Sequence, residues 1–301
     1  MAFSWNYNGM EFPLWAVFAL LCASFSALVL ILPERFRADG FAVAFWNKAF
    51  AIVFMIPLVV LQGLPDQWEF YALVAAQAML WVVSDVIFFR ALPEVGAGVV
   101  SRILPISVIV TFCAWFLFDH DLFAQYLDTP VRSGLVCAAL AGSVYFATRL
   151  KKDPVSWAAI RRIWFVLFAA VIGPLMYKLV TKYTTIEQGP FAFVMFEAMV
   201  MVFVWSVFYG IKKPVPVSVL FSKESLRAGA CVGAAMCLVS LTKFAAMHYV
   251  DNPGLVPAVK YLDAIIVMAY YKAIGKIEKA DVVAGLGIVA CAAAIIVLRS
   301  T

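Results

Sequence analysis

Eight ionisable residues lie inside long apolar stretches of the sequence, where a charge is costly. They are Lys48, Asp85, Arg102, Lys178, Glu197, Lys243, Lys260 and Asp263. A charge at the centre of a membrane-spanning helix costs about 2.5–3.5 kcal/mol, so it persists where it pairs, contacts water or binds a ligand. Five of the eight are basic and three are acidic, which leaves two cations without a carboxylate. This excess predicts contact with an anionic group, and Arg102 and Lys260 are its predicted binding residues.

Further polar and aromatic side chains extend the predicted substrate site. They are Lys48, Lys243, Asn47, Trp81 and Tyr261. Trp81 precedes Asp85 by one helical turn, so the two side chains are expected on one helix face. Tyr261 directly follows Lys260, and adjacent helical residues point about 100° apart. Together these residue types suit a small polar molecule that bears an anionic group.

The three acids, Asp85, Glu197 and Asp263, have two alternative roles. One carries a coupling proton if transport is proton-driven, because desolvation favours the neutral form of a carboxyl group. Otherwise they neutralise basic residues without a substrate role. The pairings considered are Asp85 with Arg102, Lys178 with Glu197, and Lys243 with Asp263.

No signature of catalysis, metal binding or a cofactor accompanies these charges. His120 and His248 lack HExxH spacing, and Gly96-Ala97-Gly98 does not follow a strand. The cysteines have no CxxC pair and are predicted to be small core residues: Cys22, Cys113, Cys137, Cys231, Cys237 and Cys291. The chain is therefore predicted not to be an enzyme and to need no cofactor. A membrane-embedded enzyme, with Asp119-His120-Asp121 as its acid–base group, is the alternative from a different class.

The elements that hold these residues are predicted to be membrane-spanning helices. The 301 residues are 65% apolar and 14% charged, whereas soluble domains carry about 25% charged residues. A helix needs about 20 apolar residues to cross a bilayer. Ten stretches qualify: 13–32, 41–61, 70–90, 95–118, 132–149, 161–181, 189–209, 227–248, 253–273 and 281–298. The first has no A-x-A cleavage site and is predicted to be a span, not a removed signal peptide.

The Lys and Arg residues of the loops predict the orientation in the membrane. Loops after the odd-numbered spans carry fifteen of them: Arg35, Arg37, Arg90, Arg149, Lys151, Lys152, Arg161, Arg162, Lys212, Lys213, Lys223, Arg227, Lys272, Lys276 and Lys279. The opposite side carries three: Arg132, Lys182 and Arg299. The odd-numbered loops are thus predicted to be cytoplasmic and both termini to lie outside.

An internal repeat divides the chain into residues 1–150 and 151–301, five spans each, which together form one membrane domain. Residues 40–61 align without gaps on 189–210, and residues 69–118 align on 227–276. Because five is an odd number, the second half must be inverted. Inverted repeats are a common plan of transporters, with the substrate site between the halves.

The repeat places charged residues at equivalent positions. The alignment pairs Arg102 with Lys260, Asp85 with Lys243, and Lys48 with Glu197. In the inverted arrangement the first-half residues belong to the cytoplasmic half of the membrane, and their second-half equivalents to the outer half. Charges are therefore expected at both ends of a central cavity.

Two loose motifs accompany this organisation. One runs from Gly275-Lys276-Ile277-Glu278 to Gly285-Leu286-Gly287, and the other is Asn252-Pro253, which opens the ninth span. With ten spans in two halves, the chain resembles the EamA-like branch of the drug/metabolite transporter superfamily. The resemblance implies an alternating-access exporter of amino acids or related small metabolites, located in the cell membrane.

The same resemblance leaves an alternative substrate class. Other branches of the superfamily carry phosphorylated or nucleotide-linked solutes, and the Arg102 and Lys260 pair resembles their phosphate-binding residues. The predicted partners are a small-molecule substrate, membrane lipid, and protons or a counter-substrate. Nucleic acid is not expected, because the net charge is only +5 and the basic residues lie in short loops.

Overall fold

The computed structural model describes residues 13–36, 38–95, 104–149, 157–275 and 281–300, and these residues form helices without a strand. The helices are α1 (Leu14–Phe36), α2 (Gly40–Gln62), α3 (Trp68–Val95), α5 (Ile106–Trp115), α6 (His120–Asp128), α7 (Pro130–Arg149), α8 (Trp157–Arg162), α9 (Trp164–Val180), α10 (Gly189–Lys212), α11 (Val217–Leu220), α12 (Lys223–Tyr249), α13 (Leu255–Lys260), α14 (Leu262–Ala273) and α15 (Val282–Ser300). A short 3₁₀ helix, η1 (Thr181–Tyr183), follows α9.

Six helices of the described residues are long and apolar enough to cross a membrane: those of residues 14–32, 40–62, 130–149, 164–183, 189–212 and 223–249. The pair α5 and α6 adds a seventh if it is counted as one span, although the two helices meet at 102°. Helix α15 is also apolar, but it is shorter. The chain is therefore an all-α, multi-pass membrane protein, with the predicted helical spans confirmed at these six places.

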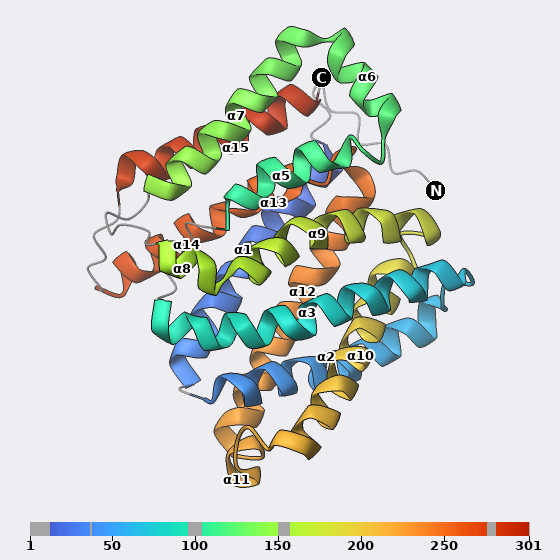
Figure 1. Ribbon diagram of the computed structural model, residues 1–301, viewed down its shortest axis with the longest axis vertical. Helices are drawn as coiled ribbons and strands as arrows, with labels where there is room; N and C mark the ends of the chain where they lie inside the picture. The colour runs from blue at the N-terminus through green and yellow to red at the C-terminus, as the bar shows by residue number, and fades with distance from the viewer. Residues whose placement is uncertain (1–12, 37, 96–103, 150–156, 276–280, 301) are drawn as a thin grey trace.

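The helices pack as an elongated bundle in which sequence-distant segments lie side by side (Figure 1). Helices α7 and α15 form a pair at one end of the bundle, and α2 and α10 form a pair toward the other end. The long helix α12 packs on both α1 and α2. Helix α3 packs on α9 and α10. The core thus brings helices of both sequence halves into direct contact.

Glycines make the closest of these contacts. On α12, a Cβ at Gly229 would collide with the Trp46 side chain, and one at Gly233 would lie 2.7 Å from the Asn47 carbonyl oxygen. Small residues let the backbones of membrane helices approach closely. The Gly229-x-x-x-Gly233 spacing therefore fixes α12 directly on α2.

Side-chain caps define several helix ends. The Asp39 carboxylate accepts from the backbone N–H groups of Phe41 and Ala42 at the start of α2. Asp119 caps α6 through the Leu122 N–H, and Ser222 caps α12 through the Ser225 N–H. Such caps satisfy helix N–H groups that have no partner within the helix.

The predicted ninth span, 253–273, is not one continuous helix. It divides into α13 and α14 at Tyr261, whose φ and ψ are −62° and −6°. A ψ near zero tightens the chain toward 3₁₀ geometry, which interrupts the α-helical hydrogen-bond ladder. The buried Asn252 holds the entry to α13: its amide donates to the Phe112 carbonyl of α5 and its oxygen accepts from the Gly254 N–H.

The prediction that all cysteines are core residues is wrong for three of them. Cys22 and Cys237 are buried and Cys291 is half-buried, but Cys113, Cys137 and Cys231 are exposed on the bundle. The physical reason is the solvent: in a bilayer an apolar side chain needs no protein core to leave water.

Candidate functional site

A buried ion pair joins the two helices α2 and α10. The Lys48 ammonium lies 2.7 Å from the Glu197 carboxylate, and both residues are almost fully buried, at 7% and 2% exposure. Each residue is eight positions after the start of its helix, or about 12 Å along the axis. Both charges are therefore well inside the apolar spans, where either one alone would be costly.

The Asp85 carboxylate of α3 lies beside this pair. Lys48 attracts it and Glu197 repels it, so one ammonium is shared between two carboxylates. Asp85 is half-buried, and within the described residues it makes no hydrogen bond or close ion pair. This group of three, Lys48, Glu197 and Asp85, is called the carboxylate–lysine triad below.

Lys243 of α12 has a different environment. Its ammonium lies 4.1 Å from the ring centroid of Tyr177 and 5.9 Å from that of Trp81. It is half-buried, and no carboxylate of the described residues lies within ion-pair distance. Cation–π contact stabilises an ammonium but leaves its charge uncompensated. Lys243 can therefore donate hydrogen bonds to an anion.

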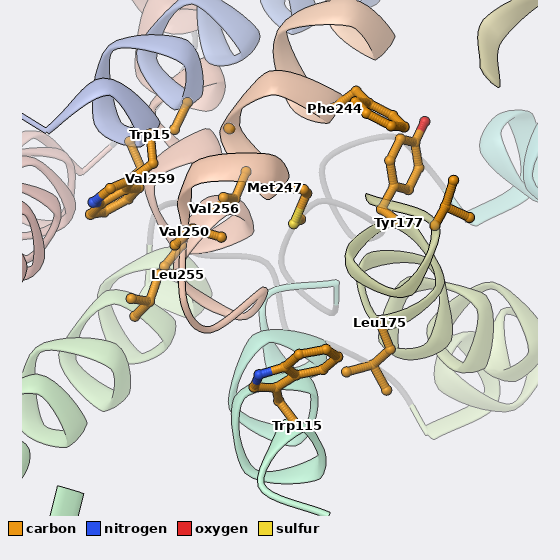
Figure 2. Close-up of a cluster of buried hydrophobic side chains, with 14 of the residues drawn as sticks. Trp15, Trp115, Leu175, Tyr177, Phe244, Met247, Val250, Leu255, Val256 and Val259 are labelled. Carbon is orange, nitrogen blue, oxygen red and sulfur yellow. The ribbon is translucent and has the colours of Figure 1, made fainter. Parts of the chain in front are cut away.

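The aromatic surroundings of Lys243 are firmly packed. Figure 2 shows Tyr177 of α9 pointing toward Phe244 of α12, the residue after Lys243. The Tyr177 ring also packs on Phe193, 4.4 Å between centroids. The Trp81 indole packs directly on Gly173 of α9, where an added Cβ would lie 2.8 Å from the ring. The rings around the ammonium are thus held by three helices.

A second ion pair lies at the break between α13 and α14. The Lys260 ammonium is 3.1 Å from Asp263, which also accepts a hydrogen bond of 2.9 Å from the Ser26 hydroxyl of α1. The Lys260 side chain is 31% exposed, far more than Lys48. Lys260 repels Lys243 electrostatically, so the two cations belong to one electrostatic neighbourhood.

The remaining predicted site residues are placed as follows. Asn47 is buried beside Lys48; its amide donates to the Val43 carbonyl, and its side-chain oxygen has no hydrogen-bond partner among the described residues. Tyr261 lies at the helix break, close to the Ser107 side chain of α5. Arg102 lies outside the described residues. The structure therefore brings together residues from six helices: Lys48, Asn47, Trp81, Asp85, Glu197, Lys243, Lys260, Tyr261 and Asp263.

Two of the considered ion pairs are wrong. Glu197 pairs with Lys48 and not with Lys178, whose ammonium donates 3.0 Å to the Met247 carbonyl. Asp263 pairs with Lys260 and not with Lys243. The pairing of Asp85 with Arg102 involves a residue outside the described part of the chain.

The expectation that Lys48 and Glu197 lie at opposite ends of a cavity is also wrong. Helices α2 and α10 lie side by side. Lys48 and Glu197, each about two turns after the start of its helix, meet where the two helices touch.

An open cleft of ≈ 320 Å³ lies near the ends of several spans. Its lining is Trp115, Asp119, Asp121, Leu122, Gln125, Lys178, Lys182 and Asp251. Asp119 is engaged as the α6 cap, and the Lys182 ammonium lies over the Trp115 ring. Charges of both signs at such a mouth suit polar solutes. Of the Asp119-His120-Asp121 group, Asp119 caps the start of α6, and Asp119 and Asp121 line the cleft.

Sequence reasoning missed three polar contributors. The Tyr177 ring packs against the Lys243 ammonium, and the Ser26 hydroxyl donates a hydrogen bond to Asp263. Gln77 is fully buried on α3, and neither atom of its side-chain amide is hydrogen-bonded among the described residues. Gln77 precedes Trp81 by one turn and Asp85 by two, so it shares their face. That spacing is a signal that was present in the sequence.

Within the described residues, no group of three or more His, Cys, Asp and Glu side chains could hold a metal ion. No protein-family model matches the chain, and no curated protein sequence is significantly similar to it. The chemistry of the buried charges is therefore the basis on which a function can be assigned.

Proposed function

We propose that this protein is a secondary transporter that moves a small polar metabolite bearing an anionic group across the membrane by alternating access. The observation that carries the proposal is Lys243: a cation inside the spans, held over aromatic rings, without a carboxylate partner in the described part of the chain. An apolar residue could pack at this position without the free-energy cost of placing a charge inside the membrane. A substrate anion supplies the missing negative charge.

Ten spans in two inverted halves, residues 1–150 and 151–301, are part of the proposal. Its support is the packing pattern. The repeat makes α1 equivalent to α9, α2 to α10, and α3 to α12. Under this equivalence the contact of α1 with α12 corresponds to that of α9 with α3, and the contact of α2 with α12 corresponds to that of α10 with α3. The contacts of α2 with α10 and of α7 with α15 map onto themselves. Such pairing is expected when a two-fold axis in the membrane plane relates the halves.

A carboxylate is the proposed anionic group. Three cations, Lys48, Lys243 and Lys260, face three acids in the described part of this neighbourhood, and two of the cations are already in ion pairs. One ammonium remains for the substrate, which suits a monoanion better than a phosphate dianion. Monocarboxylates fit this requirement, and an amino acid presents the same carboxylate beside its own ammonium group. Export from the cell, and membership of the EamA-like drug/metabolite transporters, are proposed from the sequence resemblance.

The test starts from the purified protein and a panel of metabolites. Thermal-shift screening identifies compounds that stabilise the fold, and uptake of those compounds into proteoliposomes measures transport. We expect carboxylates among the hits, and Lys243→Met to lose binding at least tenfold while Lys243→Arg retains part of it. Lys223→Met, an exposed lysine on the same helix, is the matched control. Equal affinity of the Lys243→Met and Lys223→Met variants would remove Lys243 from the site.

The proposed orientation places both termini outside and the loop after α10 in the cytoplasm. A cysteine at Lys213 should therefore resist an impermeant thiol reagent in intact cells, whereas one at Glu187, in the loop before α10, should react. Both positions are exposed, and the background is a variant in which the six native cysteines, three of them exposed, are replaced by serine. The opposite labelling pattern would reverse the assignment.

A further inference from the structure

We propose that Asp85 is the proton-binding group of this protein and that its protonation balances the charge of the anion bound at Lys243. The inference rests on the proposed transport function, and it names the coupling ion of that same site. It starts from the carboxylate–lysine triad, in which Lys48, Glu197 and Asp85 come from three different helices.

The two carboxylates of the triad are not equivalent. Glu197 is 2% exposed and holds the Lys48 ammonium at 2.7 Å. Asp85 is half-buried and has no close ion pair among the described residues. An unpaired carboxylate inside a span is costly in its charged form, and protonation removes that cost. Of the two acids, Asp85 is thus the one that can gain and lose a proton without breaking an ion pair.

Lys48 and Glu197 act directly on Asp85, and further titratable groups on the helices around α3 adjoin the carboxylate–lysine triad. Helix α2 contributes Lys48 and helix α10 contributes Glu197. Helix α9 contributes Tyr177, which interacts with Glu197, and helix α12 contributes Lys243, which lies over Trp81 one turn before Asp85. The carboxylate–lysine triad and the Lys243 site are therefore linked through Glu197, which interacts with Asp85, Tyr177 and Lys243.

Charge counting then links the two sites. With Asp85 ionised, the three cations and three acids of the described neighbourhood sum to zero. A bound monoanion would leave one excess negative charge inside the membrane. A proton on Asp85 restores neutrality, so anion binding at Lys243 and proton binding at Asp85 favour each other. In transport terms, one proton accompanies one anion.

Protonation of Asp85 can be measured without any substrate. Infrared difference spectra of the purified protein between about pH 9 and about pH 6, a range in which exposed carboxyl groups stay ionised, should show the carbonyl band of a neutral carboxylic acid. Asp85→Asn should remove that band, and Asp85→Glu should restore a shifted one. Glu197→Asp retains both acids and should keep the band. Persistence of the band in Asp85→Asn, or its absence from the wild-type protein, would overturn the inference.

The linkage is tested with benzoate, an aromatic monocarboxylate, and inorganic phosphate as separate probes. Benzoate affinity should fall as pH rises, by about tenfold per pH unit where one proton is taken up per anion bound. In Asp85→Asn the benzoate affinity should be independent of pH. A pH-dependent affinity that survives Asp85→Asn overturns the assignment of the proton to Asp85, as would tighter binding of phosphate than of benzoate with the same pH slope.

The two proposals fail in distinguishable ways. If no panel metabolite binds or is transported, the transport function fails, whatever the infrared result. If a metabolite is transported but its uptake in both wild type and Asp85→Asn ignores a pH gradient, transport stands and the proton site falls. The expected result is gradient-driven uptake in the wild type, and exchange without a pH response in Asp85→Asn.

Discussion

Lys48 and Lys243 are both lysines inside apolar spans, yet the groups that surround their ammonium ions differ. Lys48 is almost fully buried and neutralised by Glu197 across the contact of α2 with α10. Lys243 is half-buried and faces the rings of Tyr177 and Trp81. The first arrangement satisfies the charge within the protein. The second stabilises it incompletely and leaves its hydrogen-bond donors available.

The difference separates stability from binding. Removing one partner of a buried ion pair leaves an uncompensated charge, and this typically costs 3–5 kcal/mol. Lys243 has no carboxylate within ion-pair distance among the described residues, so removing its ammonium breaks no direct ion pair. Lys48 should therefore dominate the free energy of unfolding, and Lys243 the affinity for an anion.

The largest expected effect is that of Lys48→Met. It leaves Glu197 buried without a cation, with Asp85 as a second nearby negative charge. We expect the free energy of unfolding to fall by about 3–5 kcal/mol. Unfolding in detergent, followed by circular dichroism, measures the loss.

A double variant checks the physical cause. Lys48→Met combined with Glu197→Gln removes both charges and should recover a large part of the lost stability, as expected for directly interacting residues. If the double variant is as unstable as the sum of the two single variants, the pair contributes packing and not charge compensation.

The middle effect concerns the contact that holds the two lysine-bearing helices together. Gly233→Ala places a Cβ 2.7 Å from the Asn47 carbonyl oxygen, so α12 must shift away from α2. Overpacking of this kind costs about 1–3 kcal/mol. Gly134→Ala is the matched control, because its Cβ meets no atom within 4 Å and α7 gains a better helix former. Equal thermal stability of the two variants would contradict a tight α12–α2 contact.

Much of the fold was predictable because membrane-spanning helices can be recognised in a sequence by their length and apolar composition. The six confirmed spans are long apolar stretches between charged or turn-forming loops. The break at Tyr261 was not predictable, since residues 253–273 are mostly apolar, neither Gly nor Pro stands at the break, and a single ψ value divides the helix. The 102° bend between α5 and α6, in contrast, lies at the predicted end of the fourth span, next to the Asp119 cap of α6.

The candidate site was predictable in its residue types but not in its pairings. Burial cost singled out Lys48, Glu197 and Asp263 because each charge lies in a long apolar stretch. The partner of each charge depends on how helices cross, and spacing along one chain does not contain that information. Lys260 with Asp263 is the exception, because residues three apart on a helical segment are neighbours.

The smallest effect on stability is expected for Lys243→Met. Methionine keeps an unbranched apolar stem against Tyr177 and Trp81, so the contact with the rings is largely preserved. The lost cation–π attraction, about 0.5–2 kcal/mol, is offset by the removal of a charge that is costly at this depth. The free energy of unfolding should therefore change by less than about 1 kcal/mol, measured in the same detergent as Lys48→Met. A loss as large as that of Lys48→Met would mean that Lys243 compensates a negative charge of the protein itself, and Lys243 would then be a structural ion-pair residue with no role in binding an anion.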